Sequence, residues 1–156
     1  MNPLFARAVF AFVALPGIVA FLIPWMLIDR SVSSNSPGLL ALGPGILLLL
    51  WCVREFYVSG RGTLAPWEPP RHLVVTGLYR FSRNSMYIAV ILVLIGWAIG
   101  FRSRAVSVYA MVVAIAFHLR VVLFEEPWLA RTFGEQWVDY RTRVPRWVSF
   151  RRRGRA

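Results

Sequence analysis

The sequence predicts an all-α integral membrane protein with about four transmembrane helices, at residues 8–28, 39–53, 86–101 and 105–124. Three observations predict this fold. The 156 residues are 58% hydrophobic and only 16% charged, which is too apolar for a soluble domain of this size. Apolar residues also gather in long windows without charge, as bilayer-crossing helices of about 20 residues require. Finally, most basic residues lie between alternate windows, so that they would share one side of a membrane.

The first window, residues 8–28, holds 21 uncharged residues between Arg7 and Asp29. It contains Pro16 and Pro24, which membrane helices tolerate better than soluble helices do. A cleaved signal peptide is the alternative. However, the apolar run is longer than the usual signal-peptide core of about 7–15 residues, and no clear small-residue cleavage site follows it. We therefore expect a membrane anchor.

The next three windows are separated by turn-forming or charged residues. A segment of serine, asparagine, proline and glycine precedes the window at residues 39–53. The window at 86–101 begins after Asn84 and Ser85, either of which can cap a helix N-terminus. Only an Arg-Ser-Arg connection separates it from the window at 105–124. The last two helices must therefore form a tight antiparallel hairpin.

The distribution of arginine predicts the topology. All 18 basic residues are arginine, against 7 acidic residues, and the formal net charge is +11. With four spans, 15 of the 18 arginines fall on the side that holds both termini and residues 54–83. The positive-inside rule puts that side in the cytoplasm, for which we expect a bacterial-type inner membrane. No basic helix carries groove-reading residues, so we expect no nucleic-acid partner, and the arginines at 151–155 are expected to anchor the chain on anionic lipid.

Most known catalytic and metal-binding patterns are absent from the sequence. The lone Cys52 excludes a disulfide framework and a cysteine-rich metal site. With only His72 and His118, a metal site would have to depend on carboxylates, and we expect none. His118 precedes Glu125 by two helical turns and would share its face, although a packing role is the alternative. There is no nucleophile elbow, zincin motif, phosphate-binding loop or dinucleotide fingerprint.

Two stretches on the predicted cytosolic side are candidates for function. The loop at residues 60–87 is rich in proline, glycine and aromatic residues, and a loop of this length is usually functional or disordered. Its aromatic residues argue against disorder, and it leads into a helix start that suits an anion. In the second stretch, Glu125 and Glu126 are adjacent at the end of a membrane helix. Such carboxylates are costly unless they are functional or form interfacial salt bridges with nearby arginines.

Motifs in these two stretches resemble the isoprenylcysteine carboxyl methyltransferase family, which belongs to a broader group with the phospholipid N-methyltransferases. The resemblance covers residues 54–147 of what we expect to be a single domain, residues 1–156, and the first two helices match only in hydropathy. The motifs are Thr-Gly-Leu-Tyr-Arg at 76–80, Arg-Asn-Ser-Met-Tyr at 83–87, Glu-Glu at 125–126, the segment 133–140, and Arg-Val-Pro-Arg-Trp at 143–147.

The resemblance implies a membrane enzyme that takes S-adenosylmethionine from the cytosol and a lipid-like acceptor from the bilayer. Eukaryotic members have His-Pro where this chain has Asn84 and Ser85. The family's acceptor-binding arginine falls on Val121 here, beside Arg120, which puts a carboxylate acceptor in doubt more than the cofactor. The cofactor residues that the resemblance implies are Arg71, His72, Leu73, Val74, Tyr79, Asn84, Ser85, Met86, Tyr87 and Glu125.

The chemistry of S-adenosylmethionine is compatible with these residues. Its sulfonium requires aromatic faces, its amino group an acid, and its carboxylate an arginine or helix-start N–H groups. Tyrosines and Trp137 can supply the faces, Glu125 or Glu126 the acid, and Arg83 with the following helix start the anion site.

Two residues are predicted to act on the acceptor. Arg120 could hold an acidic acceptor, whereas Glu126 could receive or orient an amine. We favour carboxyl O-methylation of an isoprenylcysteine-like or other lipophilic acceptor. The alternatives are phospholipid amine N-methylation, thiol S-methylation and, in a different class, a non-enzymatic membrane scaffold protein.

Overall fold

The computed structural model describes residues 13–29, 36–58 and 72–148, and every regular element in these ranges is helical. The predicted all-α fold is therefore confirmed for this part of the chain. The elements in chain order are the π-helix η1 (Val13–Leu22), α2 (Ile23–Leu27), α3 (Ser36–Val58), the 3₁₀-helix η2 (Gly77–Arg80), α4 (Ser85–Gly100), α5 (Arg104–Arg120), the π-helix η3 (Val121–Glu125) and α6 (Glu126–Arg143).

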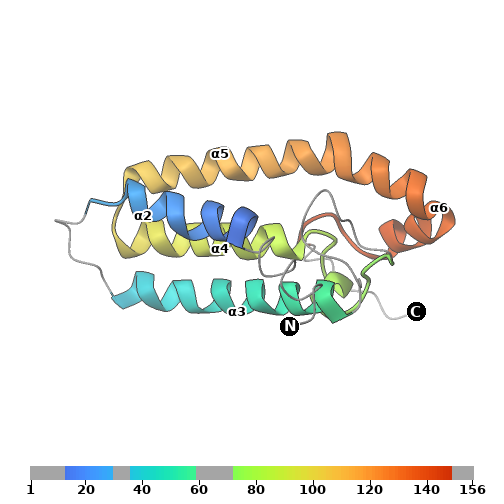
Figure 1. The fold of residues 1–156 in the computed structure, drawn as a ribbon, viewed down its shortest axis with the longest axis horizontal. Coiled ribbons are helices and arrows are strands. Elements are labelled where there is room, and N and C mark those ends of the chain that lie inside the picture. The colour runs from blue at the N-terminus through green and yellow to red at the C-terminus, as the bar shows by residue number, and fades with distance from the viewer. Residues whose placement is uncertain (1–12, 30–35, 59–71, 149–156) are drawn as a thin grey trace.

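The apolar helices lie along the long axis of the molecule, and α4 is central (Figure 1). It packs against α3 on one side and α5 on the other, and η1 also contacts it. Buried residues from these helices form the main core, which includes Leu49, Val93, Leu94 and Val113. A Cβ added at Gly38 would lie 2.0 Å from the Gly100 Cα, so glycine is required for the close approach of α3 and α4.

The second predicted span is longer in the structure, because α3 runs from Ser36 to Val58 rather than over residues 39–53. The charged pair Arg54 and Glu55 bounded the apolar window. Yet Glu55 is only 7% exposed. Its carboxylate is satisfied by two donors: the Thr76 hydroxyl donates to Oε2 at 2.8 Å, and Arg54 Nη1 donates to Oε1 at 3.2 Å. Since the buried carboxylate has partners, the helix continues past it.

The third and fourth predicted helices form the expected hairpin. α4 ends at Gly100 and α5 begins at Arg104. Ser103 caps α5, because its hydroxyl accepts a hydrogen bond from the Val106 N–H at 3.3 Å. Figure 1 shows the two helices running antiparallel, joined by this turn.

The fourth predicted helix does not end at residue 124, because α5, η3 and the first part of α6 continue one another as far as a kink at Gly134, and α6 then ends at Arg143. Pro127 does not stop it, since proline is tolerated in the first turn of α6. The 30 residues from Arg104 to Phe133, before this kink, span about 45 Å at about 1.5 Å each, which exceeds the hydrocarbon thickness of about 30 Å. Only part of the run can therefore lie in a membrane, and α5 is the apolar part.

By length and composition, the run Arg104–Arg143 is the one helix among the described residues that could cross a membrane. Pro16–Leu27 and Ser85–Gly100 are shorter apolar helices, and residues 8–12 of the first predicted span lie outside the described residues. The outward surface is that of a membrane-associated protein, because large apolar side chains are widely exposed on α3 and α5. Examples are Leu40, Leu47, Leu50, Val108, Met111, Val112, Ile115 and Leu119.

We expect Gly77→Ala to lower the free energy of unfolding by about 1–3 kcal/mol. Gly77 has φ +56°, and an added Cβ would lie 2.8 Å from the Glu55 Cδ, so alanine would be strained and would also displace a buried carboxylate. Thermal unfolding in detergent measures the effect. Gly43→Ala is the matched control, because that position in α3 has open space around it. Equal unfolding temperatures for the two variants would contradict the account.

Candidate functional site

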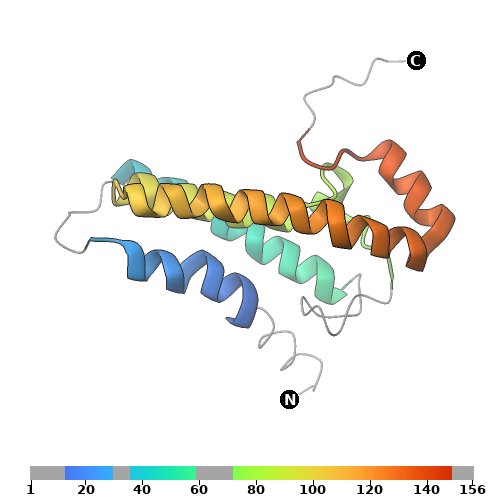
Figure 2. The ribbon, with the colours of Figure 1, turned by 90° about the horizontal axis from the view of Figure 1, so that it is seen from above.

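The segment after α6, residues 144–148, crosses the N-terminal end of α4, and we call it the strap. Gly134, with φ +50° and ψ −121°, interrupts α6 and turns the chain back from the line of α5 (Figure 2). The strap is then fixed through its backbone. The Arg83 N–H donates to the Pro145 carbonyl at 3.0 Å, and Asn84 Nδ2 donates to the Arg146 carbonyl at 2.9 Å.

Glu126 joins the strap to the loop before α4. Its Oε1 accepts from Arg83 Nη1 at 2.8 Å, and Arg146 binds both carboxylate oxygens, with Nε at 2.8 Å and Nη2 at 2.7 Å. Burial disfavours the ionised carboxylate, but the hydrogen bond from Arg146 and the positive charges nearby outweigh burial. The pKa of Glu126 therefore lies below its ordinary value, and the side chain is an anion at neutral pH.

Arg83 lies between this carboxylate and a buried tryptophan. Its guanidinium carbon is 5.2 Å from the centroid of the Trp137 ring, a cation–π contact, and Trp137 is only 2% exposed. Burial lowers the pKa of Arg83, while Glu126 opposes that shift. The aromatic face that the sequence predicted for the cofactor sulfonium is thus covered by an arginine of the protein itself.

Glu125 forms a second cluster on a different side of the helix. The Tyr87 hydroxyl and Arg120 Nε both bind its Oε1, the latter at 2.8 Å. The Tyr87 ring packs on Phe117 with 4.3 Å between centroids. This cluster brings together three predicted site residues from α4, α5 and η3. Within the described ranges no hydrogen bond involves Glu125 Oε2, so this oxygen can accept one from a ligand.

The π-helix η3 makes the Arg120–Glu125 pair possible. In an α-helix, residues five apart point about 140° away from one another. The Glu126 N–H bonds to the Val121 carbonyl, an i to i+5 bond, and the wider turn places residues five apart on one face. The adjacent residues Glu125 and Glu126 therefore bind different partners. Each forms a salt bridge with an arginine, which was one of the two alternatives that the sequence left open.

The remaining predicted cofactor residues lie around these clusters. Arg71 falls outside the described residues, and His72 is exposed. Leu73 packs with Trp137 and Tyr140, whereas Val74 is buried beside Cys52 and Tyr79. The Tyr79 ring is buried, its pKa is raised well above the ordinary value by burial, and its carbonyl accepts from the Tyr140 hydroxyl at 2.7 Å.

The capping prediction for α4 is wrong. Asn84 occupies the N-cap position without a side-chain cap bond, because its amide is directed to the strap. The Ser85 hydroxyl donates to the Leu78 and Ser82 carbonyls, both at 2.9 Å, and so closes the preceding loop. Met86 packs against the cores on both sides of α4.

Several structurally important residues escaped the sequence analysis. Glu55, Ser82 and Tyr140 each make hydrogen bonds to segments far away in the chain. The only sequence signal for Glu55 was an acidic residue directly after an apolar window, and nothing indicated Thr76 as its partner. His118, predicted to share a face with Glu125, instead accepts a hydrogen bond at Nδ1 from Trp147 Nε1 at 3.3 Å.

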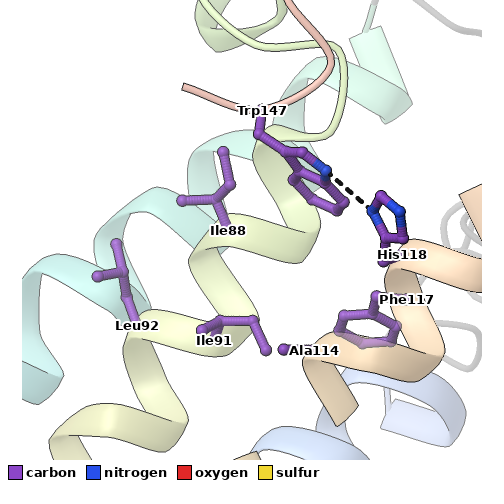
Figure 3. A pocket seen from close by; sticks show the side chains of 7 residues that line it. All are labelled: Ile88, Ile91, Leu92, Ala114, Phe117, His118 and Trp147. Carbon is purple, nitrogen blue, oxygen red and sulfur yellow. Dashed lines mark hydrogen bonds between the residues drawn. The ribbon is translucent and has the colours of Figure 1, made fainter. Parts of the chain in front are cut away.

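An apolar cavity of about 360 Å³ lies between α4 and α5, next to the second cluster (Figure 3). None of its lining side chains is fully buried, so it communicates with the exterior. Its walls come from both helices and from the strap: Ile88, Ile91, Leu92, Ala114, Phe117, His118 and Trp147. Elsewhere in the described ranges, no three His, Cys, Asp or Glu side chains converge as metal ligands do.

Comparison with known families explains this combination of apolar helices and charged clusters. The model of the phospholipid methyltransferase family matches residues 36–136, about two thirds of the chain. The chain belongs to this family. Phospholipid methyltransferase family membership confirms the predicted broader group, and makes the protein a membrane methyltransferase. The family match begins with α3, earlier than the motif resemblance, and ends before the strap. No curated protein and no solved structure matches the chain.

Proposed function

We propose that this protein is an integral membrane methyltransferase that uses S-adenosylmethionine to methylate a lipophilic acceptor. The observation that carries the proposal is the cluster of Glu125, Tyr87 and Arg120 beside an apolar cavity in a chain of the phospholipid methyltransferase family. The charged and aromatic side chains of the cluster can bind the charged groups of the cofactor, whereas the apolar cavity can bind a lipophilic acceptor.

The residues present fit the cofactor. Glu125 is 31% exposed, and Oε2 can accept a hydrogen bond from the cofactor amino group. The Tyr87 ring offers an aromatic face to a sulfonium, and the exposed Arg80 is available to pair with the carboxylate. Bound S-adenosylmethionine would supply an electrophilic methyl group. The chain's own contribution is then alignment and the exclusion of water, to which the strap contributes by covering the start of α4.

The acceptor that we favour is a carboxylate on a lipophilic molecule, such as an isoprenylcysteine. Transfer to an ionised carboxylate requires no general base, and Arg120, with 48% of its side chain exposed, can hold such a group. Glu126 is committed to two arginines, which supports a role in positioning the strap rather than in receiving an amine.

A second candidate is N-methylation of a phospholipid amine, which the family match favours. Thiol S-methylation has no specific observation in its favour, and a non-enzymatic scaffold would leave the Glu125 cluster without a function.

For topology, we propose four spans with both termini and both charged clusters on the cytoplasmic side, within a single domain. The arginine distribution supports this orientation, and it gives the clusters access to a water-soluble cofactor. Membrane lipids then surround the exposed apolar faces of α3 and α5.

The experiment that tests the function supplies the purified protein with methyl-labelled S-adenosylmethionine and three acceptors: a farnesylcysteine analogue, phosphatidylethanolamine and a small alkyl thiol. We expect label in the first, released by base because the product is an ester. Base-stable label in phosphatidylethanolamine would support the second candidate. Absence of transfer to every acceptor, together with absence of cofactor binding, would leave only the scaffold.

A further inference from the structure

The cavity between α4 and α5 has a lining suited to one kind of ligand. Apart from His118 and the indole N–H of Trp147, its lining side chains are hydrocarbon. These two polar groups bind each other, with Trp147 Nε1 donating to His118 Nδ1 at 3.3 Å (Figure 3). The lining offers no counter-ion to a charged ligand, whereas an apolar chain would bury its surface against apolar side chains.

The cavity lies next to the proposed reaction site. Phe117 lines it and packs at 4.3 Å against the Tyr87 ring, whose hydroxyl binds Glu125. A ligand that fills the cavity as far as Phe117 therefore lies one aromatic layer from the Glu125 cluster.

Apolar ligands can reach the cavity from the bilayer. Its lining side chains are partly exposed, and the neighbouring outward residues of α5 are apolar as well. Met111, Ile115 and Leu119 are 60%, 55% and 49% exposed, on a surface that lipid would cover. An alkyl or isoprenoid chain can therefore pass from lipid into the cavity without crossing water.

Among the residues that the structure describes, Trp147 is the only one from outside the α4–α5 hairpin that lines the cavity. The strap holds it, through Asn84 Nδ2 and the Ser82 hydroxyl on the Arg146 carbonyl and through Arg146 on Glu126. Its indole lies at the edge of the cavity beside Ile88 and His118, as Figure 3 shows. The shape of the cavity thus depends on one large side chain whose position is fixed independently of the hairpin.

We propose that this cavity binds the hydrocarbon chain of the acceptor, and that Trp147 determines which chains it admits. The proposal rests on the proposed function, because it assigns the cavity to the acceptor of that reaction. Its test must therefore work without methyl transfer.

The probe is a phosphatidylethanolamine with a photoreactive diazirine in its acyl chain, mixed with the full-length protein in lipid nanodiscs without cofactor. Mass spectrometry locates the cross-links. We expect them to concentrate on Ile91, Leu92 and Ala114, and to disappear with excess unlabelled farnesylcysteine analogue. Equal labelling of Met111 and Ile115, without competition, would show ordinary lipid contact only and would overturn the proposal.

Two pairs of variants sharpen the test. Ala114→Trp fills the cavity and should reduce the competed labelling at least about tenfold, because the indole takes the volume of the chain. Ala116→Trp is the matched control, since Ala116 is exposed on the same helix, and its labelling should match that of the wild type. If Ala114→Trp fails to fold, the wild-type map decides alone.

For Trp147, alanine should raise labelling by a methyl-branched chain several-fold relative to a linear chain, whereas phenylalanine should preserve the wild-type ratio. An unchanged ratio in Trp147→Ala would remove Trp147 as the determinant of chain choice. Failure of methyl transfer with intact, competed labelling would count against the proposed function alone.

Discussion

Replacing Glu125 by glutamine is expected to lower kcat/KM for methyl transfer by about 100-fold, equivalent to about 2.7 kcal/mol. Glutamine keeps the shape of the side chain but removes the charge that faces Arg120 and that we propose binds the cofactor amino group. A hydrogen bond to a charged group contributes about 1.5–3 kcal/mol, and two such contacts depend on Glu125. The rate of methyl transfer, measured at saturating acceptor while the concentration of labelled cofactor is varied, gives kcat/KM for the cofactor.

The control for this substitution is Glu135→Gln. Glu135 is exposed on α6 and has the same change of charge, so it should retain wild-type activity. Both variants should unfold near the wild-type temperature, because Glu125 is at the surface of the bundle and 31% exposed. If the two variants were equally active, Glu125 would have no place in the reaction.

Replacing Glu126 by alanine is expected to detach the strap and to lower the free energy of unfolding by about 2–4 kcal/mol. The substitution leaves Arg83 and Arg146 without their carboxylate, and Arg83 is only 12% exposed. An unpaired, partly buried arginine costs more than the loss of a surface ion pair. We expect the strap to become susceptible to trypsin after Arg146, and methyl transfer to fall with it.

Asp139→Asn is the matched control for the ion pair. Asp139 pairs with Arg143 on the same helix, but the two side chains are 61% and 66% exposed. Exposed pairs of this kind contribute less than about 1 kcal/mol. Thermal unfolding and limited trypsin digestion of both variants should therefore separate them. A Glu126→Ala protein as stable and protease-resistant as Asp139→Asn would refute the anchoring role of the strap.

The elements predicted well are those that local sequence determines. α4 agrees with its predicted range to within one residue at each end, because a long apolar window is bounded by polar residues on both sides. The hairpin followed from a connection too short for any other arrangement, and Ser103 caps α5 with its own hydroxyl.

Helix ends that depend on distant partners could not be predicted. α3 continues through Glu55 because Thr76, 21 residues away, binds its carboxylate. Asn84 gives up its capping role for a carbonyl 62 residues away. No local pattern encodes either contact, since both require the loop and the strap to be folded already.

The π-helix η3 is the reason that the geometry of the site could not be predicted from the sequence. The sequence placed Glu125 and Glu126 beside arginines, and the structure has both carboxylates in such pairs. An α-helical period, however, relates Glu125 to His118 and separates it from Arg120. The wider turn at Val121–Glu125 reverses this relation, and no local pattern in the sequence indicates it.

Calorimetric titration of S-adenosylmethionine into the purified full-length protein in detergent tests the central claim most directly, because it asks for the cofactor site without assuming an acceptor. We predict saturable binding by the wild type and by Glu135→Gln, with affinity at least about tenfold weaker in Glu125→Gln, a difference of about 1.4 kcal/mol. Absence of heat for the folded wild type, with no thermal stabilisation by excess cofactor, would contradict the account, as would equal affinity in all three proteins.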